Sequence, residues 1–167
     1  MAILNPRKKF NFRVSILPMP EIPTFSVQQI TLGDSVIEQV EHGFGNTVLK
    51  TAGQIKPGTV NLHMIEESHS GVIGAKLWAW HWQVQNPALQ AGADPMEYKR
   101  ILKIEELGTG LGTPTALNVW FAVGAWPATM NGKEFDRVSS DNTVRSIEFS
   151  VDYLTQDLPP EGILFYG

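Results

Sequence analysis

The sequence predicts a mainly antiparallel β fold, an α+β sandwich or barrel with one helix between the early and late strands. Two observations predict it. Residues 9–16 and 143–154 alternate apolar and polar side chains, the period of two that is typical of a half-buried strand. Residues 71–87 instead repeat apolar side chains at helical spacing. Strands account for most of the 167 residues, and we expect a single domain over 1–167.

In the first half of the chain, strands flank one glycine-rich segment. Prolines at 17–23 predict a loop, and residues 25–42 predict two strands or one broken strand. Residues 43–58 are too rich in glycine for a helix, which predicts an extended loop or loose hairpin that projects from the body. An alternating strand follows at 59–67. The projecting segment carries four apolar residues with no local core to join: Phe44, Val48, Leu49 and Ile55.

Two interpretations compete for residues 71–87. Three tryptophans alternate as in a strand, whereas four apolar residues fit one face of a helix. The helix is favoured because the segment is long, Ser70 can cap its start and Pro87 can end it. Trp78 and Trp82 then face outward, so we expect a neighbouring molecule to cover them. The helical stripe consists of Ile73, Leu77, Trp80 and Val84.

In the second half, the sequence predicts a turn at 89–96 and a strand at 98–107, then a hairpin tip at 108–115 and a strand at 116–126. One face of that last strand carries Leu117, Val119, Phe121 and Val123. Pro127 has no N–H to donate, so we expect it to end the strand. Trp126 is then expected to anchor the following loop on the body or on the next subunit.

The strand at 143–154 shows the clearest alternation in the chain. Its apolar residues Ile147, Phe149, Val151 and Tyr153 are expected inside, and its polar residues Ser146, Glu148, Ser150 and Asp152 outside. Residues 155–167 then form a C-terminal extension that ends in an apolar cluster. We expect this cluster to dock on a neighbouring subunit or ring, and a disordered end is the alternative.

Composition excludes several classes of function. Charged residues make up 18% of the chain, below the roughly 25% of soluble domains, so copies of the chain are expected to cover much of its surface. The net charge of −4 gives no basic field for nucleic acid. The absence of cysteine excludes disulfides and thiolate metal sites. The longest apolar run, 119–126, is too short for a membrane helix, so no membrane insertion is expected.

No residue pattern in the sequence indicates catalysis, a metal or a cofactor. His63, His69 and His81 lack the spacing of a ligand pair on one element. Adjacent glutamates at 66–67 and 105–106 split across strand faces, although a fold could still gather the carboxylates of a hydrolase. The tryptophans could also stack on sugars, so a Trp-rich carbohydrate-binding sandwich is the alternative to a structural protein.

The order of these elements resembles that of the tail tube proteins of contractile bacteriophages and related injection machines. The resemblance covers residues 8–154. It includes the opening strand "KFNFRVSI", the glycine-rich segment followed by Gly-x-Val-x-Leu at 58–62, and the helix "LWAWHWQV". It also includes the Gly-x-Trp-Pro turn at 124–127 before a last alternating strand. The extension at 155–167 and the tryptophan-rich helix depart from the pattern.

The resemblance implies a non-enzymatic virion protein that is assembled in the host cytoplasm. Proteins of this family form hexameric rings that stack into a tube, and each subunit contributes a sheet to a continuous β-barrel around a channel. A sheath surrounds the tube, a baseplate and a tail terminator lie at its ends, and DNA passes through during ejection without specific binding. Residues 43–58 would then contact an adjacent ring, and Trp78, Trp82 and Trp126 would lie at subunit interfaces.

We expect the channel to be lined by the polar face of the last strand: Ser146, Glu148, Ser150 and Asp152. Thr59, Asn61 and His63 would share this face, together with Glu38 or Glu41 from the strand at 36–42. Because a slip of one residue exchanges the two faces of a strand, this expectation depends on the register.

Overall fold

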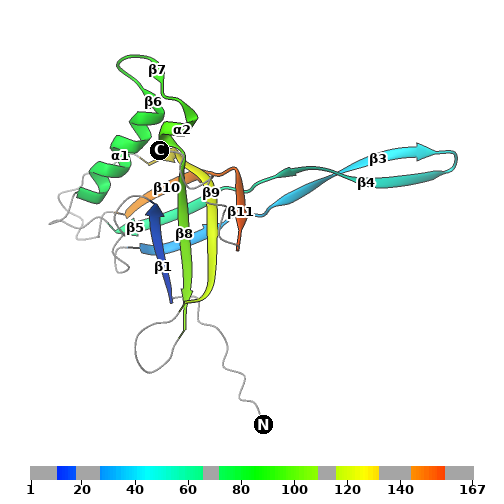
Figure 1. Ribbon diagram of the computed structural model, residues 1–167, viewed down its shortest axis with the longest axis horizontal. Helices are drawn as coiled ribbons and strands as arrows, with labels where there is room; N and C mark the ends of the chain where they lie inside the picture. The colour runs from blue at the N-terminus through cyan, green and yellow to red at the C-terminus, as the bar shows by residue number, and fades with distance from the viewer. Residues whose placement is uncertain (1–10, 18–26, 66–71, 109–115, 132–143, 157–167) are drawn as a thin grey trace, which may run out of the picture.

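The computed structural model describes residues 11–17, 27–65, 72–108, 116–131 and 144–156. Figure 1 shows the elements within these ranges. In chain order they are β1 (Phe12–Leu17), β2 (Val27–Leu32), β3 (Val36–Phe44), β4 (Thr47–Lys56), β5 (Val60–Ile65), α1 (Val72–Val84), β6 (Gln85–Asn86), β7 (Ala91–Gly92), α2 (Pro95–Tyr98), β8 (Arg100–Leu107), β9 (Ala116–Met130), β10 (Val144–Ser150) and β11 (Tyr153–Thr155). Predictions for the loop at 18–23, for 109–115, for His69, Ser70 and the glutamates at 66–67, for the side chain of Ile73, and for 157–167 lie outside the described residues.

The main sheet has seven strands in the order β1-β8-β9-β10-β5-β2, with β11 paired to β9. All of these pairs are antiparallel, which confirms the predicted fold class. The sheet folds into two layers. The first layer consists of β1, β8, β11 and the first part of β9, and the second consists of the end of β9 with β10, β5 and β2. Strands β1 and β2 end the strand order without pairing to each other, so the described strands do not form a closed sheet.

A single apolar core fills the space between the two layers. The first layer contributes Val14, Ile16, Leu102, Ile104 and Ala122, and the second contributes Val60, Leu62, Met64, Ile147 and Phe149. The alternation predicted for 59–67 and 143–154 is confirmed, because buried and partly exposed residues alternate along β5 and β10. The predicted last strand, however, divides at Val151-Asp152 into β10 and β11.

Strand β9 passes from one layer to the other at Gly124. Up to Ala125 the strand pairs with β8 and β11, and from Trp126 it pairs with β10. Gly124 has φ +67°, a conformation that favours glycine. A β-carbon there would lie 2.0 Å from Oδ2 of Asp152, whose backbone N–H donates to Val123 O at 2.9 Å. Glycine therefore allows both the bend and the close approach of the β10–β11 connection.

The expectation that Pro127 ends its strand is wrong. Strand β9 continues to Met130, and Pro127 pairs with Phe149 in β10. The ladder tolerates proline because the register shifts between Glu148 and Phe149, an irregularity of the kind where a missing N–H is accommodated. The carbonyl of Pro127 accepts a hydrogen bond from the His81 ring at 2.8 Å, which ties α1 to the strand.

The face of β9 predicted from Leu117 to Val123 does not point into the main core. Phe121 and Val123 join Ile101 in a separate small cluster, whereas Ala122 and Ala125 contact the main core from the other face. Leu117 is exposed. Both faces of this strand are apolar near the bend, and for that reason its alternation did not identify the core side.

The helix predicted at 71–87 is confirmed as α1, which packs on β9. Leu77 and Trp80 of the predicted stripe are buried, and Val84 is half-buried. Trp80 Nε1 donates to the carbonyl of Tyr98 at 2.6 Å, and its ring lies 5.7 Å from that of Phe149. The predicted turn at 89–96 contains β7, which pairs with β6, and the start of α2, where the Asp94 side chain accepts a hydrogen bond from Met96 N–H and caps the first turn.

Candidate assembly surfaces

The segment predicted to project from the body is a long two-stranded hairpin. Strands β3 and β4 pair with each other outside the main sheet, and Figure 1 shows them extending far from the body. Every residue from Val36 to Lys56 is exposed except Glu38 and Gly53. The tip is a two-residue turn, Gly45-Asn46, in which Gly45 has φ +61°. The hairpin interpretation is thus confirmed, with more regular strands than the glycine content had indicated.

Both faces of the hairpin carry apolar residues. The register pairs His42 with Leu49 on one face and Gly43 with Val48 on the other. Cross-strand ion pairs join Glu41 to Lys50 at 3.1 Å and Glu38 to Lys56. The exposed large apolar residues are Val36, Ile37, Val40, Phe44, Val48, Leu49 and Ile55. Among the described residues, neither face of the hairpin is buried, so its apolar side chains form an exposed surface of the kind that marks interaction sites.

Two glycines allow two backbone segments to pack closely at the base of the hairpin. The N–H of Gly33 donates to Thr59 O at 2.7 Å, where the β2–β5 ladder ends. A β-carbon on Gly58 would lie 2.4 Å from the carbonyl carbon of Gly33, and one on Gly33 would lie 2.6 Å from Thr59 O. Backbone thus packs directly on backbone where the hairpin leaves the body, and this contact fixes its exit.

On α1, an aromatic group faces away from the core, as predicted. Trp82 is 52% exposed, and Trp78 is half-buried. Their ring centroids are 5.6 Å apart, and the His81 ring meets Trp78 edge-on at 5.8 Å. Arg145 from β10 lies over Trp78 at 5.7 Å, which holds this ring against the body. Trp82 is therefore the tryptophan of the pair with a free face.

The third predicted interface tryptophan packs within its own chain. Trp126 is half-buried against the main core, and its ring meets Tyr98 of α2 edge-on at 5.9 Å. This contact ties Trp126 to α2, whereas the loop that Trp126 was expected to anchor falls at 132–143, outside the described residues. A contact of Trp126 with a neighbouring subunit remains a prediction.

A polar face covers the side of the second layer that points away from the core. The register places Gln29, His63 and Ser146 in one row, and Thr31, Asn61 and Glu148 in the next. Thr129 of β9 extends the second row, beside Glu148. The predicted grouping of Asn61 and His63 with the polar residues of the last strand is thus confirmed. Among the described residues of these rows, Glu148 is the one carboxylate, and none is lysine or arginine.

Three acidic residues considered for this polar face lie elsewhere. Asp152 follows the end of β10, and its carboxylate accepts hydrogen bonds from Lys99 Nζ at 2.7 and 2.8 Å. Glu38 and Glu41 belong to the projecting hairpin, so the expectation that their strand shares the face is wrong. Ser146, Glu148 and Ser150 remain on the face as predicted.

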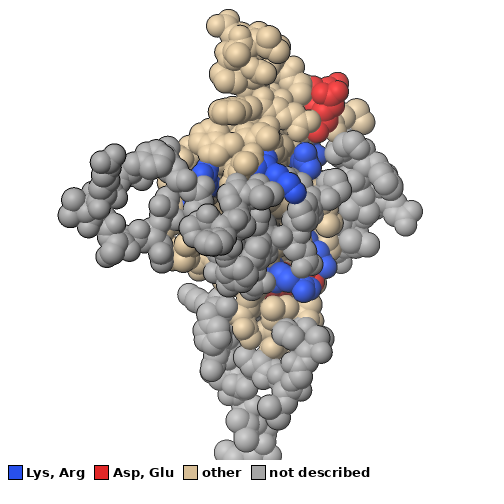
Figure 2. Space-filling view, turned by 90° about the vertical axis from the view of Figure 1, so that its left-hand side faces the viewer, with Lys and Arg blue, Asp and Glu red and all other residues tan. Residues whose placement is uncertain are grey.

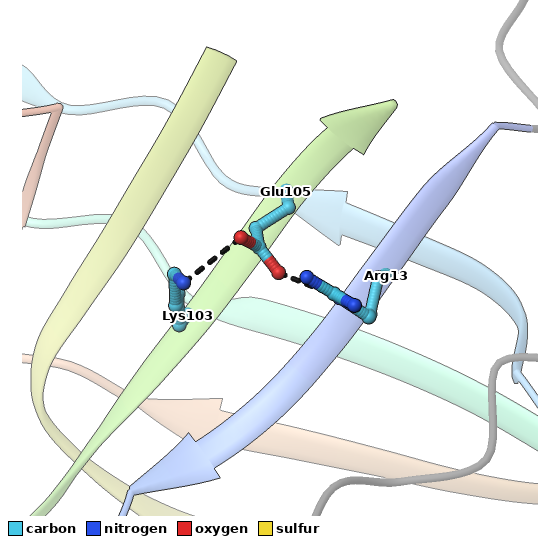
Figure 3. A network of polar contacts seen from close by, with 3 residues as sticks. All are labelled: Arg13, Lys103 and Glu105. Atoms are coloured by element: carbon cyan, nitrogen blue, oxygen red, sulfur yellow. Dashed lines mark hydrogen bonds and ion pairs between the residues drawn. The ribbon is translucent and has the colours of Figure 1, made fainter. Parts of the chain in front are cut away.

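A network of charges lies on the outer side of the first layer (Figure 3). Glu105 is 4% exposed; it accepts a hydrogen bond from Arg13 Nε at 2.7 Å and forms an ion pair with Lys103 Nζ at 2.8 Å. The hydrogen bond from Arg13 is the main reason that the pKa of Glu105 lies below its ordinary value, while burial acts in the opposite direction. The network joins neighbouring strands β1 and β8.

The groups that the sequence analysis considered for chemistry do not come together in the described part of the chain. No group of three or more His, Asp or Glu residues there could hold a metal ion. Within the same residues, no helix is both long and apolar enough to cross a membrane. Glu105 and Glu106 do not converge: Glu105 binds Arg13, and Glu106 accepts from Asn118 Nδ2 at 2.9 Å. His63 lies on the polar face and His81 on α1, on separate elements.

No family model matches the chain, and no curated protein matches it. Solved structures of contractile injection systems, however, share its fold. A chain of the sheath/tube terminator of the extracellular contractile injection system PVC superposes with TM-score 0.72 at 21% identity, covering 94% of this chain and 100% of that one. The anti-feeding prophage cap, which terminates the AFP tube, gives TM-score 0.71 at 20% identity, with 93% of each chain covered. A chain of the PVC sheath–tube complex gives 0.70 at 19%, with 92% of each covered.

The chain has the tube fold of contractile injection systems. This confirms the fold that the resemblance implied. Within the tube fold, sequence reasoning missed the Arg13–Glu105–Lys103 network and the Gly33–Gly58 contact. Glu105 could have been found, because it lies next to Ile104 on the opposite face of its strand, the face that also carries Lys103. The glycine contact could not, because it joins residues that only the folded chain brings together.

Proposed function

We propose that the protein is a structural subunit of a tube, without catalytic activity, in which rings of six copies stack along a common axis. The observation that carries this proposal is the β3–β4 hairpin, which exposes apolar residues on both faces and packs on nothing in its own described chain. A monomer would gain nothing from such an element, whereas a stacked assembly would bury it. The open ends of the sheet at β1 and β2 suit closure across neighbouring copies.

The polar face of the second layer is proposed to line the channel. It is the side of that sheet opposite the core, and its two rows carry amide, hydroxyl and imidazole groups with a single carboxylate. Without lysine or arginine in these rows, the surface offers no ion pair to phosphate groups. Such a channel would let DNA slide past without being held.

The proposed setting is the tail of a virion or a related injector, with assembly in the host cytoplasm. The similar structures come from a sheath–tube complex, a tube terminator and a tube cap. By analogy, a sheath would surround the tube, and a terminator and a baseplate would bind its two ends.

Size-exclusion chromatography with light scattering, followed by negative-stain microscopy, tests the proposal. We expect rings or tubes with sixfold symmetry from the purified protein. A carbohydrate-binding module would instead stay monomeric and bind glycans. A monomer at every concentration and ionic strength tried would refute the tube.

A hairpin variant sharpens this test. Replacing residues 41–50 by Asn-Gly joins Val40 to Thr51, which already face each other, through a two-residue turn. Because the removed part packs on nothing in its own described chain, the variant should fold and melt like the wild type but form no tubes. The matched control, Glu41→Ala with Lys50→Ala, removes only an exposed ion pair and should still assemble.

A further inference from the structure

We propose that residues 157–167 fold back over the outer side of the first layer of their own chain and cover an apolar cluster there. The outer side is the face of β1, β8, β9 and β11 that points away from the main core. The outer cluster consists of Ile101, Phe121 and Val123. A partner that approaches this side of the subunit would then meet residues 157–167 instead of the strands.

The outer cluster is buried although it lies on the side of a sheet opposite the core. Ile101 is 4% exposed, Phe121 5% and Val123 2%. The residues next to them, Leu102 and Ala122, contact the main core from the other side of the sheet. Neighbours within a sheet shield the flanks of a side chain, but its outer end is buried only when another segment lies over the sheet. A further segment therefore covers the outer cluster.

Among the described elements, none packs extensively on this side of the layer. Strands β1, β8, β9 and β11 pair edge to edge. Helix α1 does pack on β9, but from the side of the main core, to which Leu77 and Trp80 belong. The β3–β4 hairpin extends away from the body (Figure 1). The cover therefore belongs to a part of the chain that the structure does not describe.

Residues 157–167 start beside the outer cluster. They follow β11, whose Tyr153 pairs with Val123 and packs against the cluster. Pro159 and Pro160 have no N–H to donate, so they end any extension of the β11 ladder and free the chain to leave the edge. Eleven extended residues reach roughly 36 Å, whereas the four strands of the layer span only about 15 Å. The segment is long enough to cross the whole layer.

The apolar residues of this segment match the outer cluster. Residues 163–166 read Ile-Leu-Phe-Tyr. Docking them on the outer cluster removes apolar surface from water on both sides of the contact. The sequence alone suggested a neighbouring subunit as the receptor, but the outer cluster is already buried within one chain, which favours the chain's own face.

The charges of the two surfaces are also complementary. Residues 157–167 carry Asp157 and Glu161 and no lysine or arginine. On the outer side of β1 and β8, the described charged residues are Arg13 and Lys103 with the single carboxylate of Glu105. Figure 2 views the molecule from the side on which β1 lies in Figure 1, and among the described atoms it shows more basic than acidic ones on the body. An acidic segment is therefore attracted to this side.

The other parts of the chain outside the description are less suited to this position. Residues 1–10 carry three basic residues and no acidic one, and they precede the end of β1 that lies far from Ile101. Residues 109–115 connect β8 to β9 at that same end and contain one large apolar residue. Three further segments lead to or from elements of the second layer: 18–26, 66–71 and 132–143.

Cross-linking within one subunit tests the contact, because the wild-type chain has no cysteine. Gly162→Cys stands directly before the apolar run, and Leu17→Cys lies on the outer side of β1, opposite Ile101. The double variant is diluted until light scattering shows monomers, and it is then treated with a short bismaleimide. We expect an intramolecular product by peptide mass spectrometry. The control pairs Gly162→Cys with Thr31→Cys, an exposed position on the polar face of the second layer, and should give little product.

A mixture of the two single variants Gly162→Cys and Leu17→Cys, one of them isotopically labelled, separates docking within a chain from docking between chains. We expect no product that joins a labelled to an unlabelled chain. A mixed product in place of the intramolecular one would overturn the proposal, because the segment would then dock on a neighbouring subunit. Equal intramolecular yields in the double variant and its control would also overturn it, because the segment would then be undocked.

Binding of the apolar dye ANS provides a second readout. Removing residues 157–167 should uncover the outer cluster and raise the dye fluorescence of the folded subunit several-fold. A full-length variant should act in the same way when it combines four changes: Ile163→Ser, Leu164→Ser, Phe165→Ser and Tyr166→Ser. Val48→Ser with Leu49→Ser on the hairpin is the control, because these side chains are already exposed, and it should not raise the fluorescence.

Hydrogen exchange completes this readout. Slow exchange along β5 and β10 shows that a variant is still folded, and exchange at Tyr153–Thr155 should become faster when β11 loses its cover. If both variants stay folded and keep wild-type dye binding and exchange, another segment covers the outer cluster and the proposal is wrong. If a variant does not fold, the cross-linking yields decide.

Discussion

Replacing Gly124 by alanine should destabilise the subunit, because β9 passes from one layer to the other at this residue. Gly124 has φ +67°, and a β-carbon there would lie 2.0 Å from Oδ2 and 2.5 Å from Cγ of Asp152. An L-residue in the left-handed region costs about 1–2 kcal/mol. The Asp152 side chain must also move away, and it then loses Lys99, a partly exposed pair worth up to about 1 kcal/mol. The sum is about 1–3 kcal/mol.

Thermal and urea unfolding of the isolated subunit measure this cost. Since about 1 kcal/mol shifts Tm by roughly 2–4 °C in a domain of this size, we expect a decrease of about 2–12 °C. Gly43→Ala is the matched control, because a β-carbon there meets nothing within 4 Å and its φ is ordinary. If Gly124→Ala melts within a degree of Gly43→Ala, the strand does not need glycine to change layers and the reasoning fails.

Three further predictions concern other surfaces. Gly58→Ala should redirect the hairpin, because the new β-carbon meets the Gly33 backbone; we expect soluble subunits that form no tubes by negative stain, and normal tubes would contradict this role. Glu105→Gln should lower the free energy of unfolding at pH 7 by about 1–3 kcal/mol. Because the folded pKa of Glu105 is depressed, its contribution is present above the ordinary value of 4.5 and is lost as pH falls through the folded value, so urea curves for the two proteins should converge in acid. Glu148→Lys should leave tubes intact but slow or block DNA passage, and Glu97→Lys on α2 is its control.

Local patterns predicted the elements, but not their relations in space. The alternation along 59–67 and 143–154 fixed which side chains of β5 and β10 are buried, since each strand has one apolar face. The helix was found from a stripe whose Leu77 and Trp80 are buried. The exposed hairpin was found because its apolar residues had no local partner.

Predictions failed where two distant segments decide the outcome. Pro127 was expected to end a strand, but the shift in register on β10 lets the ladder pass it. Asp152 was expected on the face of Glu148, but the bend around Gly124 places it at Lys99 instead. Both errors lie where β9 passes from one layer to the other. The alternation of apolar and polar residues does not show where a strand changes layers.

The bend of β9 at Gly124 places Asp152 away from the polar face, so Glu148 is the carboxylate that sets the charge of the proposed channel. Asp152 is neutralised by Lys99, whereas Glu148 lies between Thr129 and Asn61, neither of which carries a charge. In a ring of six copies, this position repeats six times around one narrow channel, and repulsion among like charges and phosphates is strongest where little water screens it. Changing Glu148 to lysine alters the ring by twelve charges at one level without touching the core, because the side chain points away from Phe149 and Ile147. If Glu148→Lys leaves DNA passage unchanged, the polar face lies on the outside of the tube, next to the sheath, and the proposed channel lining is wrong.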